Sequence, residues 1–118
     1  MKYLVLLAGD GEVPPWTEMT EAEQAQLLTR FGEFDEACSA RDGVEILSGE
    51  PLQEGATATS VRTRGGEVIV TEGPYAEAFE GLGGYYLMEV PDLDVLLELI
   101  RLLPPYDMEL RPAGMPEG

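Results

Sequence analysis

The chain has 118 residues, and its 23 acidic residues against 7 basic ones give a formal net charge of −16. It has no histidine and one cysteine, Cys38, which excludes histidine-based catalysis, histidine metal ligands, an internal disulfide and cysteine-based zinc sites. We therefore expect neither a metal nor a cofactor. The negative charge repels nucleic-acid phosphates and anionic membrane surfaces, and no apolar run approaches the ~18 residues of a membrane span. The length predicts a single domain, 1–118, and the composition favours a cytoplasmic protein.

The first half of the chain predicts a strand, a helix and a short second strand. Tyr3 to Ala8 is a continuous apolar run, typical of a strand buried on both faces and too short for a signal-peptide core. Thr20 and Glu23 have the spacing of a capping box, which predicts a helix over 21–40. A strand is expected over 44–48. The residues at helical spacing that predict the buried face of the helix are Gln24, Leu27, Leu28, Phe31, Phe34 and Cys38.

The middle of the chain predicts a β-hairpin. Residues 57–64 and 67–71 have strand character and are separated by Gly65-Gly66, a pair suited to a two-residue turn. The glycine-rich stretch 72–84 follows, and one helical turn is expected within it, near 76–80.

The last third of the chain predicts a strand, a second helix and a final strand. Residues 85–90 form the strand, and Asp92 is placed to cap a helix over 93–103. Residues 106–111 alternate between apolar and charged side chains, as a strand with one buried face does. Residues 113–118 are expected to be a flexible tail. The predicted apolar stripe of the second helix consists of Leu93, Leu96, Leu97, Ile100 and Leu103.

This order of elements predicts an α+β fold of the ferredoxin-like sandwich type with an inserted β-hairpin. Two helices would cover one face of an antiparallel sheet and leave the other face open. Tyr85 and Leu87 would lie on that open face beside Glu89. Two interpretations stay open: a one-sided sheet with scattered apolar groups, and the one we favour, a homodimer in which two open faces meet.

The segment EGPYAEAFEGLGGYYLMEVPDLD, residues 72–94, resembles the signature of the YCII-related family, in the branch that carries a DGPF motif. The similarity continues in MKYLVLLAGD at residues 1–10, in residues 56–75 and in MELRP at residues 108–112. It implies a ferredoxin-like fold and dimers of the α+β-barrel type. Some genes of the branch lie beside extracytoplasmic-function sigma factors, which implies a regulatory partner. The resemblance implies no particular reaction.

The chain departs from the family motif at two positions, where Glu72 replaces the aspartate and Tyr75 replaces the phenylalanine. Some relatives in the wider family have been proposed to use a His-Asp pair. That pair is impossible in a chain without histidine.

The candidate ligand site is centred on Glu72-Gly73-Pro74-Tyr75, where a Gly-Pro turn would place a carboxylate and an aromatic ring on a pocket wall. The alternative is turn chemistry alone, with Glu72 bonded to nearby backbone amides. Asp10 follows the first strand and is, with Glu72, a catalytic candidate. A close pair of carboxylates raises one pKa and yields a general acid for proton transfer of the lyase or isomerase kind. The alternative for Asp10 is a solvated loop residue.

Two further residues are candidates for ligand contact. Arg62, on the same strand face as Arg64, would hold an anionic group, unless it serves only for ion pairing. Tyr85 would donate its phenol to a ligand, unless it packs in a dimer interface. The leading hypothesis is therefore a small homodimer that binds a small organic ligand, and enzyme activity stays open. The alternative is a non-enzymatic interaction module that acts with a transcription regulator such as an extracytoplasmic-function sigma factor.

Overall fold

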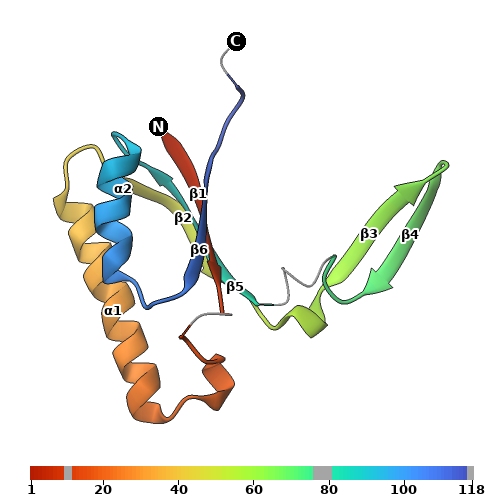
Figure 1. Cartoon of the computed structure of the whole chain (residues 1–118), viewed down its shortest axis with the longest axis horizontal. Coiled ribbons are helices and arrows are strands. Elements are labelled where there is room, and N and C mark those ends of the chain that lie inside the picture. The colour runs from red at the N-terminus through yellow and green to blue at the C-terminus, as the bar shows by residue number, and fades with distance from the viewer. Residues whose placement is uncertain (10–11, 76–80, 117–118) are drawn as a thin grey trace.

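The computed structural model describes residues 1–9, 12–75 and 81–116. The helices form one layer and cover one face of a four-stranded sheet (Figure 1). A β-hairpin stands away from the sheet on the side opposite the helices. None of the helices in these ranges has the length and apolar character needed to cross a bilayer.

The sheet consists of β1 (Lys2–Ala8), β2 (Glu45–Pro51), β5 (Leu82–Glu89) and β6 (Asp107–Pro112) in the order β2-β5-β1-β6. All three neighbouring pairs are antiparallel. The two central strands, β1 and β5, each have strand neighbours on both sides, and a helix precedes each of the edge strands β2 and β6 in the chain. This arrangement confirms the predicted α+β, ferredoxin-like fold.

Helix α1 (Glu21–Ala40) begins at the predicted capping box. The Glu23 amide donates to Oγ1 of Thr20 over 3.2 Å, and the Thr20 amide donates to Oε1 of Glu23 over 3.1 Å. Two amides that would otherwise lack a partner at the first turn are thereby satisfied. The predicted bounds of this helix are confirmed.

Helix α2 (Leu93–Leu99) is shorter than predicted. Asp92 caps it by accepting a hydrogen bond from the Val95 amide over 2.9 Å. The chain then tightens into a 3-10 turn, η4 (Ile100–Leu102), where the Leu103 amide donates to the Ile100 carbonyl. Pro104 follows Leu103 and has no amide proton to continue an α-helical ladder. The helix predicted to reach residue 103 was therefore too long.

The core lies between the sheet and the helices. Alternate residues of β1 face the helices and are buried there, while Phe34 of α1 and Met88 of β5 are fully covered. Phe34 packs against Tyr86 with ring centroids 5.1 Å apart. The buried cluster consists of Tyr3, Val5, Leu7, Phe34, Cys38, Met88, Val90, Leu96, Leu99 and Leu103.

Two helical stripes differ from the prediction. Leu28 is 59% exposed, because it shares the outer side of α1 with the exposed Asp35, whereas Phe31, Phe34 and Cys38 face the core. On α2, Leu93 and Leu97 are exposed, whereas Leu99, which was not predicted, is buried. Leu96, Ile100 and Leu103 of the predicted stripe do pack into the core, but Leu103 does so from beyond the end of α2.

The sheet face opposite the helices carries an apolar centre. Leu6 lies opposite Tyr85 and Leu4 lies opposite Leu87 in the β1–β5 register, and all four side chains are half-buried. We call these four residues the open-face stripe. Charged residues flank the stripe on both edge strands: Glu50 of β2 lies opposite Tyr85, and Glu109 and Arg111 of β6 lie opposite Leu6 and Leu4. Glu45 and Asp107 lie one register step beyond the stripe, opposite Glu89 and Ala8.

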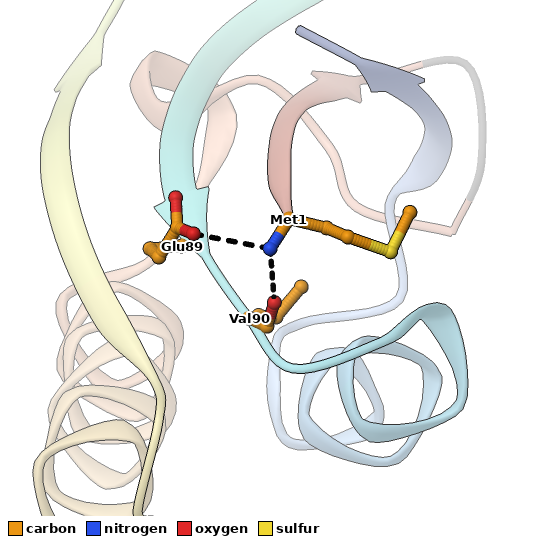
Figure 2. Close-up of polar contacts among 3 residues, drawn as sticks. All are labelled: Met1, Glu89 and Val90. Carbon is orange, nitrogen blue, oxygen red and sulfur yellow. Dashed lines mark hydrogen bonds and ion pairs between the residues drawn. The ribbon is translucent and has the colours of Figure 1, made fainter. Parts of the chain in front are cut away.

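The start of β1 is tied to the end of β5 (Figure 2). The Met1 nitrogen donates to Oε1 of Glu89 over 3.0 Å and to the Val90 carbonyl over 2.8 Å. These contacts hold the two central strands in register at this end of the sheet.

The hairpin consists of β3 (Thr59–Arg64) and β4 (Glu67–Glu72), joined by the turn Gly65-Gly66. Within the described ranges these strands pair with each other and with no strand of the four-stranded sheet. Every side chain on the two strands is exposed except that of Ser60, which is 7% exposed. The hairpin is thus joined to the body at its base and is open to solvent along its length.

Candidate functional site at the base of the hairpin

A cavity of about 480 Å³ lies where the hairpin meets the body of the protein. The connection from β2 to β3, the first half of β3, the turn after β4 and the start of β5 form its walls. This volume lies within the roughly 300–1,000 Å³ of small-molecule sites. The side chains that define its character are Leu52, Glu54, Val61, Pro74, Tyr75 and Leu82.

The turn after β4 is held by backbone and side-chain bonds. Gly73 has a φ of 92°, a conformation that L-residues with a Cβ rarely adopt. Its amide donates to the Ala58 carbonyl over 2.7 Å, and its carbonyl accepts from Oγ of Ser60, also over 2.7 Å. Ser60 is nearly buried, so water competes little for this bond. The turn therefore presents Pro74 and Tyr75 to the cavity in a fixed orientation.

Arg62 of β3 also holds Tyr75 in place. The guanidinium carbon of Arg62 lies 4.7 Å from the centre of the Tyr75 ring, and Nη2 of Arg62 donates to the Tyr75 carbonyl. A cation over an aromatic face is attracted by the negative charge of that face. Tyr75 as a whole is 54% exposed, so the contact with Arg62 is a main restraint on the orientation of the tyrosine ring. Arg62 itself does not line the cavity.

The predicted site residues divide into groups. Pro74 and Tyr75 line the cavity, Gly73 sets the turn, and Arg62 contacts Tyr75. Glu72 is the last residue of β4, opposite Thr59, with an exposed side chain that does not line the cavity.

Two other candidates are not brought into this group by the structure. Tyr85 lies in the open-face stripe, between Leu6 and Glu50 of the neighbouring strands, and does not line the cavity. Asp10 lies outside the described residues, so its distance from Glu72 stays untested.

The titratable groups with shifted pKa values lie on the helix-covered side of the sheet. Burial, with a smaller contribution from the Asp35 charge, raises the pKa of Cys38 to about 11. Burial, followed by the charges of Asp35, Cys38 and Tyr106, raises the pKa of Tyr86 to about 12. Both groups stay protonated at neutral pH, so Cys38 is a packed thiol and not a nucleophile. They belong to the core and not to the cavity.

The cavity has the chemistry of a binding pocket. Its walls are mainly aliphatic and aromatic, with hydroxyls from Thr57 and Thr59 and one carboxylate, Glu54. Such a lining takes up the apolar body of a ligand, and a few polar groups fix the ligand's direction. Across the part of the chain that the structure describes, no three acidic or cysteine side chains gather as a metal site would require.

Sequence reasoning missed most of the cavity lining, and five of the missed residues bear on the argument. Leu52, Glu54, Val61 and Leu82 line the cavity, and Ser60 anchors the turn. Four of them belong to ordinary loop or strand patterns and meet only in three dimensions. Ser60 is the partial exception. It is a small polar residue inside a predicted strand, and such a residue becomes a candidate for a side-chain hydrogen bond if that side of the strand is buried.

Comparison with known proteins adds one positive finding. The family model described as the YCII-related domain matches residues 1–110, which is nearly the whole chain. No curated protein shows a significant match.

Proposed function

Because the chain belongs to the YCII-related family, we propose from this fold and site that it is a cytoplasmic homodimer that binds a small organic ligand at the base of its hairpin. The observation that carries the ligand proposal is the placement of Tyr75. This residue lines a cavity of about 480 Å³ and is at the same time held by Arg62. A half-exposed aromatic ring fixed on a pocket wall is a suitable stacking surface for a planar or apolar ligand.

We propose that this site binds a ligand, and we do not propose that it catalyses a reaction. Glu72 lies one residue before the turn, outside the cavity lining, and its side chain is exposed. A general acid or base must lie within hydrogen-bond reach of the reacting atom. Glu72 does not have that position relative to the cavity. We also propose membership of the DGPF-motif branch, supported by residues 72–75, where Gly and Pro keep the motif and Glu and Tyr replace Asp and Phe.

The homodimer proposal is supported by the open-face stripe, which is apolar and lies at the centre of a sheet face that none of the described helices covers. Packing two such faces removes apolar surface from water at about 25 cal/mol per Å². The charged residues on the two edge strands would then form a polar rim, as interfaces commonly have. Leu87→Lys is expected to turn the dimer into a folded monomer in analytical ultracentrifugation. A dimer that persists in this variant would contradict the open-face arrangement.

The ligand proposal is tested by a thermal-shift screen against a metabolite library, followed by titration of each compound that shifts the transition. A ligand at about 100 times its Kd adds roughly 2.7 kcal/mol, which corresponds to a Tm rise of about 10 °C for a chain of this length.

Two variants locate the ligand at this cavity. Tyr75→Ala is expected to lose the shift. Arg64→Gln is expected to keep it, because among the described residues Arg64 bonds to the carbonyl of its neighbour Thr63 and does not line the cavity. The proposal fails if no compound shifts the wild-type protein in a dose-dependent way, or if Tyr75→Ala binds as well as wild type.

A second function, that of an interaction module, is favoured by one observation. Helix α1 exposes a set of acidic side chains, and its single arginine, Arg30, is turned back to donate to the carbonyls of Arg101 and Leu102. The exposed acidic residues are Glu21, Glu23, Glu33, Asp35 and Glu36. Such a face attracts a basic partner, for which we propose a transcription regulator such as an extracytoplasmic-function sigma factor.

This second candidate predicts association that weakens as salt rises. Titration with a purified sigma factor of this class at two salt concentrations tests it. The combined substitution Glu33→Gln and Glu36→Gln is expected to weaken the association, and equal affinity in the variant would contradict it.

A further inference from the structure

Three exposed valines lie on one face of the hairpin. Val61 lies opposite Val70, and Val68 lies opposite Thr63, so the three valines share one side of the two-stranded ribbon. Their side chains are 58%, 62% and 65% exposed for residues 61, 70 and 68. We call these three residues the valine face. Arg62 and Ile69 project from the other side of the ribbon.

An isolated two-stranded ribbon is only marginally stable in water, because it has no third strand and no layer packed on it. The valine face supplies the apolar surface that such a layer would cover. The three valines stay exposed, so no element of the described ranges covers this face. A partner surface is therefore the missing layer.

The geometry identifies which surface can reach it. The hairpin stands on the side of the sheet opposite the helices, which is the side of the open-face stripe (Figure 1). A second copy seated on that open face would lie alongside the hairpin. Strands of six residues extend about 20 Å, which is enough to pass along a neighbouring sheet.

Charge also favours a second copy. The hairpin strands carry Arg62, Arg64, Glu67 and Glu72, so this segment is neutral in a chain of net charge −16. Two acidic bodies repel each other through most of their surfaces, but the hairpin approaches an acidic body without that penalty. The edge strands beside the open-face stripe are mostly acidic, so a neutral arm is better tolerated there than a second acidic surface. The two hairpin arginines project from the side of the ribbon opposite the valine face.

From these four observations we propose that the hairpin is a dimer arm, and that its valine face packs against a second copy of this chain seated on the open sheet face. Two-fold symmetry makes the contact reciprocal, so each subunit is held by the arm of the other. The inference rests on the proposed homodimer and adds to it a specific role for the hairpin.

The test compares matched threonine variants. The double substitution Val68→Thr and Val70→Thr keeps the β-branched shape that strands prefer but replaces a buried methyl group by a hydroxyl on the valine face. Ile69→Thr makes the same kind of change on the opposite face of the same strand. Sedimentation equilibrium gives the dimer Kd of each protein. We expect at least a tenfold increase in Kd for the valine variant and less than a twofold change for Ile69→Thr.

Hydrogen exchange of the wild-type protein provides a second measurement that needs no substitution. Amides of residues 59–72 are expected to be protected above the dimer Kd and to exchange freely after dilution below it. Free exchange in the dimer overturns the arm, as does an unchanged Kd in the valine variant. If Leu87→Lys abolishes the dimer but the valine variant keeps the wild-type Kd, the open-face dimer stands and the proposed arm is wrong. A wild-type chain that is monomeric at every concentration overturns both, whereas the ligand proposal is judged separately by the Tyr75→Ala titration.

Discussion

Arg62 lies over the ring of Tyr75, with its guanidinium carbon 4.7 Å from the ring centre, and Nη2 of Arg62 also donates to the Tyr75 carbonyl over 3.4 Å. The two residues come from different ends of the hairpin segment, so the contact links β3 to the turn that follows β4. An exposed cation–π pair contributes about 0.5–1 kcal/mol. Tyr75 therefore owes its orientation at the cavity to a residue that does not itself line the cavity.

Replacing Arg62 by Gln is expected to weaken ligand binding about two- to fivefold, since the ring becomes free to leave the pocket wall. Isothermal titration calorimetry with a compound found in the thermal-shift screen measures the change. Arg64→Gln removes the same charge from the same strand face and is expected to keep wild-type affinity. Equal losses in the two variants would show that net charge, and not ring orientation, controls binding.

Ser60→Ala is expected to destabilise the protein by about 1–3 kcal/mol, because the Gly73 carbonyl loses its donor in a poorly hydrated place. Urea unfolding followed by circular dichroism gives this free energy. Thr63→Ala, at an exposed position on the same strand, is the control and is expected to change stability by less than about 0.5 kcal/mol. If the two variants unfold alike, the hydroxyl of Ser60 does not hold the turn.

Gly49→Ala is expected to cost about 1–3 kcal/mol of unfolding free energy. A Cβ at this position would lie 2.7 Å from Cδ1 of Tyr86 and 3.1 Å from the Tyr85 carbonyl, so the ring or the strand must shift. Gly32 in α1 has open space at the same place, and Gly32→Ala is expected to stabilise the helix by about 0.5–1 kcal/mol. Thermal unfolding of both variants measures this contrast. If Gly49→Ala leaves the unfolding free energy unchanged, then β2 or the Tyr86 ring can shift at little cost.

Stability is expected to fall at alkaline pH. In the folded protein the pKa of Cys38 is raised from 9.0 to about 11 and that of Tyr86 from 10.0 to about 12. A raised pKa means that the unfolded chain loses these protons first, so their contribution is complete below about pH 9 and is lost as pH rises through 11 and 12. Each such group adds a slope of up to about 1.4 kcal/mol per pH unit.

Urea unfolding at pH 7, 9 and 10.5 measures this slope. Burial also raises the pKa of Tyr106. Tyr86→Phe removes one of these three titrating groups and is expected to show a shallower loss of stability above pH 10 than wild type. A wild-type slope that persists unchanged in this variant would place the alkaline transition elsewhere in the protein.

Local patterns with a physical mechanism predicted the fold well. The Thr20–Glu23 capping box fixed the start of α1, and the order of apolar runs gave the ferredoxin-like arrangement. The end of α2 was missed, because a 3-10 turn before Pro104 has the same apolar composition as a helix. Leu28 was assigned to the buried stripe because helical spacing does not give the width of that stripe, and Leu28 lies outside it.

The site was predicted only in part. Pro74 and Tyr75 were found because a Gly-Pro turn next to an aromatic residue is a local feature, and both line the cavity. Leu52 and Leu82 were not found, because they are brought together by the β2–β5 pairing across a long stretch of chain. The contact of Arg62 with Tyr75 likewise depends on the register of the hairpin, and that register cannot be deduced from the identity of the two residues.

The position of the hairpin within the chain bears on how quickly the protein folds. Edge strand β2 and central strand β5 are sequential neighbours of the sheet, and they are joined by the segment that holds β3 and β4. When the hairpin forms first, the bond from the Gly73 amide to the Ala58 carbonyl closes off its base and shortens the loop that remains. Each halving of a loop lowers its closure cost by about 0.6 kcal/mol. A hairpin that forms before the sheet would therefore speed the pairing of β2 with β5, and substitutions that slow hairpin formation would then slow assembly of the whole sheet.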